Sequence, residues 1–277
     1  MHWLKRLFQF YIISNIHVAL AVCCLVVITL LNFGMKIDIK LMGFIFFGTV
    51  SSYNFVKYFG LARFHHKRLA PWLRHIQIFA FLAFIAMLAF AVQLKPKTLM
   101  AASLIGMLTF LYSIPILPRQ WFLDKKSNLR AISGLKIYII ALVWTGVAVF
   151  LPIIDGGHPI GYDVWIYATQ IYLYVWVATL PFEIRDLQYD SLKLATIPQQ
   201  IGLNATKFLG MILLVVVVLL EFFKDDYHPM NPVIVVLVMA VTALFLMFSK
   251  KLQGQYYSSF WVEGIPMLWL GLILWLY

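Results

Sequence analysis

Acidic residues are scarce in this chain. Only 11 aspartates and glutamates occur among 277 residues, charged residues of all kinds make up 12%, and 63% of the chain is hydrophobic. This composition excludes an ordinary soluble domain and is typical of a protein that crosses a membrane several times. No segment is left over for a separate soluble domain. We therefore expect an all-α polytopic membrane protein with a single transmembrane domain over residues 1–277.

Cysteine is nearly absent as well. The two cysteines, Cys23 and Cys24, are adjacent within an apolar run and cannot link distant segments, so we predict two buried thiols. The N-terminal residues, with Lys5 and Arg6, resemble the start of a signal peptide. The apolar run nevertheless continues to about Leu31 without a small-residue cleavage site. We therefore expect a retained first helix.

Long apolar segments predict nine membrane-spanning helices, each about the length that crosses a hydrocarbon core of roughly 30 Å. With the N-terminus inside, 17 of the 22 lysines and arginines lie in cytoplasmic segments and five lie outside. This bias predicts a cytoplasmic N-terminus, an external C-terminus and an integral position in a membrane of the bacterial inner (cytoplasmic) type. The predicted spans are 10–32, 41–59, 72–93, 97–116, 131–153, 163–182, 206–223, 231–249 and 257–277.

The chain carries a formal net charge of +11. Its basic residues occupy short loops, where topology and anionic lipid headgroups explain them, so we expect membrane lipid and no nucleic acid as a partner. Two loops, 57–74 and 183–207, are longer and more polar than the rest. They occupy equivalent places if the first four and the next four helices form two related halves. A site made from both loops would open toward charged cytosolic substrates.

Three carboxylates gather in the second polar loop. Glu183, Asp186 and Asp190 follow one another at spacings of three and four residues, which places them on one face of a helix. Like charges so close together repel one another unless a cation offsets them. Mg²⁺ binds through a few carboxylates together with water and phosphate oxygens. The pattern therefore predicts a magnesium site.

This cluster, with the following Leu194–Pro198 and Gly202, resembles the second signature of the UbiA superfamily of intramembrane prenyltransferases. Through the nine predicted spans the resemblance covers essentially the whole chain. It implies a UbiA-like bundle and transfer of an isoprenyl group from an isoprenyl diphosphate to a hydrophobic or aromatic acceptor. It also implies Mg²⁺ as the cofactor, with Asp186 and Asp190 as ligands and Glu183 as a ligand or a supporting partner.

The stretch 112–119, Tyr-Ser-Ile-Pro-Ile-Leu-Pro-Arg, is similar to a second pattern of this superfamily between spans four and five. By this resemblance, Tyr112 and Arg119 are candidate catalytic residues, and Arg130 and Lys193 are candidates for substrate binding. Fixed cations stabilise a bound diphosphate and the charge that accumulates on it as it leaves. The alternative is that these basic residues only determine topology.

The first signature of the superfamily, an Asn followed by two aspartates at intervals of four, is incomplete. Asn54 is present, but Tyr58 and Ala62 stand where the aspartates are expected. A neutral phenol and a methyl group cannot hold a second Mg²⁺. Lys57 and Arg63 can replace that ion by neutralising a diphosphate directly, with Asn54 and Lys57 catalytic and Arg63 binding substrate. Alternatively, Asn54 is a helix-packing amide and the basic residues form a solvated face.

The favoured function is therefore that of a Mg²⁺-dependent prenyltransferase. One alternative is a non-catalytic UbiA-like protein that binds lipid or isoprenoid, or a subunit of a membrane assembly. The other alternative is a transporter. The scarcity of charged residues within the spans disfavours it. Glu263, inside the last predicted span, is either a functional carboxylate or one that reaches the membrane surface. The sequence does not indicate the acceptor, the isoprenoid length or the oligomeric state.

Overall fold

A computed structural model gives the structure of residues 2–64, 71–113, 134–188, 195–226 and 228–276. Side chains at 2, 58–64, 71–73 and 113 lie outside the described part. Within these ranges the chain forms helices and turns and no strand. This agrees with the predicted all-α class, since a helix satisfies its own backbone hydrogen bonds inside a bilayer.

The helices vary in length and two regions depart from regular α-helix. The apolar run Leu135–Gly156 contains a π-helical turn at Gly146–Phe150, and a second π-helical turn, Tyr257–Val262, precedes the last helix. The α-helices are α1 (His2–Ile13), α2 (Ile16–Asn32), α3 (Ile39–Phe64), α4 (Pro71–Ala91), α5 (Pro96–Ser113), α6 (Leu135–Thr145), α7 (Leu151–Gly156), α8 (Tyr162–Asp186), α9 (Ile197–Ile201), α10 (Leu203–Glu221), α11 (Asn231–Phe248) and α12 (Ile265–Leu276).

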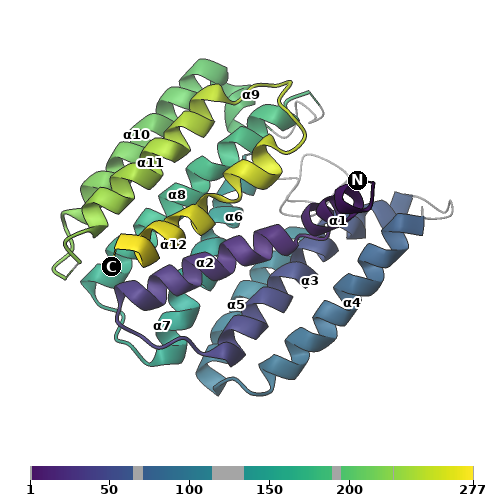
Figure 1. Cartoon of the computed structure of the whole chain (residues 1–277), viewed down its shortest axis with the longest axis horizontal. Helices are drawn as coiled ribbons and strands as arrows, with labels where there is room; N and C mark the ends of the chain where they lie inside the picture. Colours follow the sequence, from purple (N-terminus) through teal and green to yellow (C-terminus); the bar gives the residue numbers. More distant parts are fainter. Residues whose placement is uncertain (1, 65–70, 114–133, 189–194, 227, 277) are drawn as a thin grey trace, which may run out of the picture.

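The helices close into a ring. In order of contact, α2 packs on α3, α3 on α5, α5 on α6 and α6 on α8, and the ring continues through α10, α11 and α12 back to α2. Segments near the two ends of the chain therefore lie side by side, as α2 and α12 do in Figure 1. α4 lies outside the ring against α3.

The main apolar core is built around α8. Tyr167, Ile171, Tyr174 and Leu180 of this helix are at most 1% exposed and pack with side chains of α6, α10, α11 and α12. Inside a bilayer such packing, rather than exclusion of water, holds helices together. α8 is thus fixed along its length, and the residues at its end are held against the neighbouring helices.

The predicted number of spans is confirmed only in part. Six described helices are long and apolar enough to cross a membrane, or up to seven if α1 and α2 together form one span. Helix is present in each of the nine predicted segments, but α5 is too short to meet this standard. α8 also falls short because it carries Asp163, Gln170 and several tyrosines. Its packing partners shield it from lipid, so its sequence can be less apolar.

The predicted first span over residues 10–32 is two helices rather than one. α1 ends at Ile13, α2 begins at Ile16, and the two are bent by 56° at the break. Asn15 in the break has φ 63°, a left-handed conformation that asparagine tolerates better than most residues. As a result α1 lies across the end of the bundle instead of continuing α2 (Figure 1).

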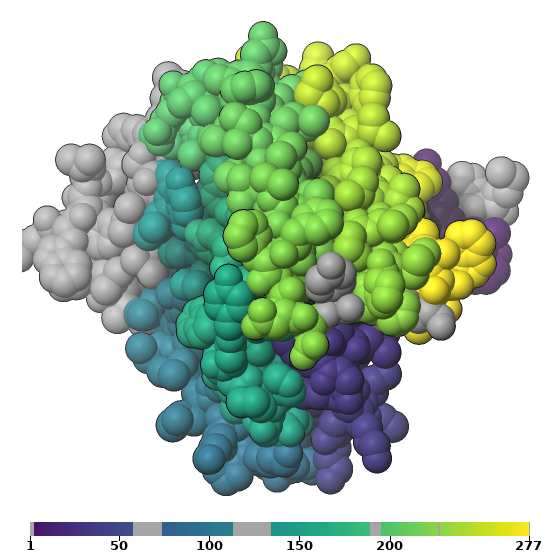
Figure 2. All heavy atoms as spheres, turned by 90° about the vertical axis from the view of Figure 1, so that its left-hand side faces the viewer, coloured from purple at the N-terminus to yellow at the C-terminus, as the bar shows by residue number. Residues whose placement is uncertain are grey.

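The outer surface is apolar where lipid is expected. Figure 2 shows α10 and α11, in green, covering the face toward the viewer. Phe208, Val215 and Leu219 on α10 and Leu244 on α11 are more than half exposed there. Both cysteines are free, Cys23 buried and Cys24 half-buried, in agreement with the prediction of two thiols.

Candidate functional site

The second signature lies at the C-terminal end of α8. Glu183 is buried, with 2% of its surface exposed, while Arg185 and Asp186 in the last turn are half-buried. Pro181 lies one turn earlier, within the helix. The described part of the signature therefore runs from the packed core to the last turn of α8. The predicted ligand Asp190 and the predicted substrate-binding Lys193 lie outside the described residues.

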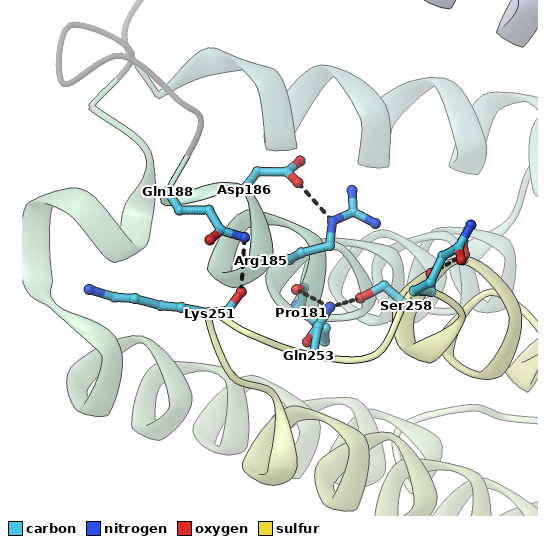
Figure 3. A network of polar contacts seen from close by, with 9 residues as sticks. Pro181, Arg185, Asp186, Gln188, Lys251, Gln253 and Ser258 are labelled. Carbon is cyan, nitrogen blue, oxygen red and sulfur yellow. Dashed lines mark hydrogen bonds and ion pairs between the residues drawn. The ribbon is translucent and has the colours of Figure 1, made fainter.

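The carboxylate of Asp186 already has a cationic partner. Arg185 donates from Nε to Asp186 Oδ1 at 2.8 Å, and its guanidinium lies 5.3 Å from the centre of the Phe182 ring. Figure 3 shows this pair beside Gln253, which donates to the Pro181 carbonyl at 3.2 Å. The turn after α11 is attached to the end of α8 by Gln188, whose side-chain amide donates to the Lys251 carbonyl at 3.3 Å. Arg185 is thus oriented by its own helix.

The first signature lies on α3, where Asn54 is 2% exposed. Its amide nitrogen donates to the carbonyls of Ser14 and Val50, each at 2.8 Å. Lys57, one turn later, donates to the carbonyl of Ile13 at 3.4 Å. Both side chains therefore donate hydrogen bonds to backbone carbonyls at the break between α1 and α2. The packing role considered for Asn54 agrees with these contacts, and the side chain of the predicted substrate-binding residue Arg63 lies outside the described part.

A cavity of about 290 Å³ lies between the two signatures, and we call it the site cavity. Lys57 reaches it from α3 and Arg185 from α8, so the structure brings together the ends of the two predicted loops. Glu263, between the π-helical turn and α12, lines it as well. The remaining lining residues are Gln9, Ile12 and Ile13 of α1, Asn15 of the break, Phe182 of α8, and Gln255, Tyr256 and Ser259.

The charges at the site cavity are two cations and one carboxylate. Lys57 and Arg185 both interact electrostatically with Glu263, although neither forms an ion pair with it within 4.0 Å among the described residues. The lining therefore presents two cationic groups, although Arg185 also pairs with the Asp186 carboxylate, which is not among the lining residues. In a medium of low dielectric constant cationic groups that line a cavity attract an anion. The arrangement is therefore suited to an anionic group such as a phosphate or diphosphate.

The remaining predicted residues are not among the described residues that line the site cavity. Tyr112, at the end of α5, is buried with 7% of its surface exposed and interacts electrostatically with Tyr53. Tyr53 in turn accepts a hydrogen bond of 2.7 Å from Nε1 of Trp144. Tyr112 thus lies near the half-buried Tyr53–Trp144 pair, and Tyr53 itself interacts electrostatically with Glu263 of the site cavity. The predicted Arg119 and Arg130 lie in 114–133, outside the described residues.

The described carboxylates do not by themselves make a magnesium site. Among the residues that the structure describes, no three histidines, cysteines, aspartates or glutamates lie close enough to hold a metal ion together. Glu183 and Asp186 are the described members of the predicted cluster, and Asp186 is paired with Arg185. On the first signature, Asn54 directs its amide nitrogen at backbone carbonyls. The donor set of this part of the site fits an anion better than Mg²⁺.

Two charged residues of the site cavity have only a weak signal in the sequence. Arg185 stands between two members of the carboxylate cluster, and nothing in the pattern marks it as a binding group. Glu263 is distinguished only as an ionisable residue in an apolar span. Its neighbours Gln255, Tyr256 and Ser259 carry no recognisable pattern. They reach the site cavity because α12 packs against α2, a contact between distant parts of the chain.

Comparison with known proteins identifies the fold. No protein-family model matches the sequence, and no curated protein matches it either. Among solved structures, a UbiA homologue from Archaeoglobus fulgidus bound to DMAPP and Mg²⁺ is similar, with TM-score 0.61, 15% identity and 94% of this chain aligned to 96% of that one. The same homologue bound to GPP and Mg²⁺ gives TM-score 0.59 and 16% identity over the same shares.

A third similar structure is that of digeranylgeranylglyceryl phosphate synthase. It gives TM-score 0.57 and 14% identity, with 98% of this chain aligned to 96% of that one. At such identities the likeness concerns the fold, and it extends over nearly the whole chain. The chain therefore has a UbiA-like fold, as the sequence resemblance predicted.

Proposed function

We propose that this UbiA-like membrane protein binds an isoprenyl diphosphate in the site cavity and transfers its isoprenyl group to a hydrophobic or aromatic acceptor. The observation that carries the proposal is the convergence of Lys57 and Arg185 on one cavity from the two helices that carry the signatures. Similar folds have been solved with DMAPP and with GPP. Membership of the prenyltransferase superfamily is part of this proposal.

The cations of the site cavity supply the electrostatic part of the mechanism. The Lys57 ammonium and the Arg185 guanidinium hold diphosphate oxygens through charge-assisted hydrogen bonds. As the bond between the isoprenyl carbon and the bridging oxygen breaks, its electron pair leaves with the diphosphate. Fixed cations stabilise this growing negative charge more than they stabilise the bound substrate. The acceptor then bonds to the allylic cation and loses a proton.

Residues around the cations protect the allylic intermediate. Ile12 and Ile13 of α1 line the site cavity and restrict the approach of water from the end of the bundle. Water would otherwise capture the cation and give an alcohol. Phe182 and Tyr256 place aromatic rings at the same cavity, and the negative face of such a ring attracts a cation.

Mg²⁺ remains a prediction for Glu183, Asp186 and Asp190. When bound there, it would neutralise charge on the diphosphate. Asp186 would hold it through the carboxylate oxygen that does not accept from Arg185, or by exchanging Arg185 for the ion. We expect Asp186→Asn to remove any Mg²⁺ dependence of diphosphate binding while leaving the protein folded. Calorimetric titration with isoprenyl diphosphate, with and without Mg²⁺, measures this; an unchanged Mg²⁺ dependence in Asp186→Asn and Asp190→Asn would exclude the cluster as the metal site.

The proposal is tested by incubating the purified protein with labelled isoprenyl diphosphates of several lengths and Mg²⁺. We expect binding and release of diphosphate, with both reduced in Lys57→Gln. Lys250→Gln is the matched control, because Lys250 is exposed at the end of α11 and does not line the site cavity. Absence of binding at every chain length contradicts the proposal.

A second candidate function is a non-catalytic protein that binds isoprenoid or lipid. It is favoured by Asn54, whose amide nitrogen is occupied by the carbonyls of Ser14 and Val50. It is also favoured by Tyr58 and Ala62, which supply no carboxylate to the first signature. The same experiment separates the two functions. Binding of the isoprenyl diphosphate without its cleavage, with any acceptor fraction prepared from membranes, supports the non-catalytic protein.

The membrane arrangement belongs to the proposal too. The chain has several apolar helices and is an integral membrane protein. We propose that residues 1–277 form one domain with nine spans, with α1 and the site cavity on the cytoplasmic side of a bacterial inner membrane. The bias of basic residues supports this orientation. Reporter fusions after Gln188 and after Asp226 test it, and an external location of the first would reverse the assignment.

A further inference from the structure

A second hollow lies on the other side of α1 from the site cavity. It is a groove of about 520 Å³ between α1 and α4. Phe10 of α1 and Phe79 of α4 join the two helices within it by packing edge to face, with ring centres 5.4 Å apart. The lining residues are Trp3, Arg6, Leu7 and Phe10 of α1 and His75, Ile78, Phe79 and Leu82 of α4.

The two walls of this groove share a chemical pattern. Trp3 and Leu7 on α1 are 63% and 53% exposed, and Ile78 and Leu82 on α4 are 50% and 57% exposed. Arg6 and His75 are the polar side chains among the lining residues that the structure describes. Ile78 and Leu82 follow His75 by one and two turns of the same helix, so the groove becomes apolar with depth.

α1 has the features of a helix that lies in the membrane interface. Its apolar residues Trp3, Leu7 and Phe10 recur at helical spacing, and Lys5 and Arg6 stand between them. Because it is bent by 56° from α2, it lies across the end of the bundle rather than continuing through the membrane. We therefore expect its groove with α4 to lie at the depth where headgroups meet acyl chains.

We propose that this groove binds one anionic phospholipid. Arg6 and His75 donate hydrogen bonds to the lipid phosphate, and one acyl chain lies along Leu7, Ile78 and Leu82. Charge complementarity supports this occupant, since Arg6 and His75 supply the polar side chains of the groove and no acidic residue is among its lining residues as described. A lipid has both the anion and the chain that the groove accommodates, whereas free phosphate has only the first.

The lipid site is separate from the proposed site of transfer. α1 lines the groove with Trp3, Arg6, Leu7 and Phe10, and it lines the site cavity with Gln9, Ile12 and Ile13. These two sets lie on different faces of the helix. Lipid binding in the groove therefore does not require isoprenyl diphosphate binding, and either can fail without the other.

The experiment measures lipid retained by the full-length protein. Protein purified in detergent is titrated with phosphatidylglycerol or phosphatidylcholine, and the bound lipid is counted by native mass spectrometry. We expect one tightly retained phosphatidylglycerol, bound about tenfold more tightly than phosphatidylcholine. Arg6→Gln is expected to abolish this preference. Lys5→Gln is the matched control, because Lys5 is the adjacent exposed cation on α1 and does not line the groove.

Two further arms keep the outcome decisive. Leu82→Trp fills the apolar end at an exposed position and is expected to reduce lipid retention while the thermal unfolding temperature stays near that of the parent. Inorganic phosphate at millimolar concentration is expected not to displace the lipid. The proposal is overturned if both lipids are retained equally, if Lys5→Gln and Arg6→Gln lose the preference equally, or if inorganic phosphate displaces the bound lipid.

Discussion

The two ends of α8 both hold charged residues, but they use them differently. At its beginning, the neighbouring Glu221 and Lys224 form an ion pair of 2.6 Å with 1% and 7% of their side chains exposed. At its end, Lys57, Arg185 and Glu263 surround a cavity of about 290 Å³. Buried charges that contact one another stabilise the packing around them, whereas cationic groups that line a cavity are placed to bind an anionic ligand.

The closed network at the beginning of α8 is well connected. Gln170 donates to Glu221 Oε2 at 2.9 Å and to the carbonyl of Val217 at the same distance. Lys224 lies 5.1 Å from the centre of the Tyr167 ring. Asp163 accepts from the backbone amides of Asp225 and Asp226, at 3.0 and 3.1 Å. These contacts attach the turn after α10 to α8, which is a structural role.

The largest effect is expected from breaking the closed network. Glu221→Ala leaves the Lys224 ammonium buried without its carboxylate, which typically costs about 3–5 kcal/mol of unfolding free energy. Chemical denaturation in detergent measures it. Asp226→Ala on the same turn is the control, because its side chain is exposed, and it should stay close to the parent. A similar loss of diphosphate binding in both variants, without loss of stability, would contradict the structural role.

The next effect concerns the cations of the site cavity. Lys57→Gln or Arg185→Gln is expected to weaken isoprenyl diphosphate binding by about 1.5–3 kcal/mol, the value of a hydrogen bond to a charged group. Stability should change little, since the cavity is not a packed core. Titration calorimetry with Lys250→Gln as the control measures the affinity. Equal affinities in all three variants would show that Lys57 and Arg185 do not bind the diphosphate, and that the charges at this end of α8 are structural like those at its beginning.

Asn54→Ala tests whether Asn54 of the first signature stabilises helix packing or binds the substrate. The change removes the donor to the Ser14 and Val50 carbonyls, and Ser14 is fully buried. We expect a loss of about 1–3 kcal/mol in unfolding free energy and faster proteolysis near the break between α1 and α2. A variant that keeps full stability but no longer binds isoprenyl diphosphate would instead give Asn54 the catalytic role predicted from the sequence.

Glu263→Gln should change the affinity for isoprenyl diphosphate in the opposite direction from substitution of Lys57 or Arg185. The substitution keeps size and removes an ionisable carboxyl group beside the bound anion. At a pH at which Glu263 is ionised, we therefore expect isoprenyl diphosphate to bind more tightly to the variant by roughly 1 kcal/mol, about fivefold. Weaker binding would mean that Glu263 accepts a hydrogen bond from the substrate. The sign of the change, measured in the same titration, distinguishes these outcomes.

The smallest expected effect is a pH dependence of stability that arises from the closed network at the beginning of α8. Burial lowers the pKa of Lys224 from its usual 10.5, and the Glu221 carboxylate partly offsets this. The unfolded chain then binds this proton more tightly than the folded protein does. Unfolding free energy should rise with pH between the lowered pKa and 10.5, and this slope should disappear in Lys224→Met. Denaturation at several alkaline pH values checks it.

The comparison also shows how far the candidate site was predictable. The spacing of Glu183 and Asp186 predicted a metal site at what the structure shows to be the end of α8, and their role as ligands stays a prediction. The absent aspartates of the first signature made Lys57 a candidate; it lines the site cavity, and its catalytic role stays a prediction. The assignments of Arg63, Arg119, Arg130, Asp190 and Lys193 stay predictions. The pairing of Asp186 with Arg185 was not predictable, because adjacency in the sequence does not determine the side-chain conformations that bring two neighbouring groups into contact.

Composition and hydropathy determined that this chain is a bundle of apolar helices in a membrane, because a bilayer accepts few other ways of satisfying the backbone. The motif at residues 183–190 determined the resemblance that the fold comparison bears out. Only the tertiary structure decided that α1 turns aside at Asn15 and that Glu263 faces Lys57 and Arg185. The break at Asn15 is held by hydrogen bonds from α3, and the position of Glu263 depends on packing between α12 and α2, at opposite ends of the chain. No local pattern of residues specifies either contact.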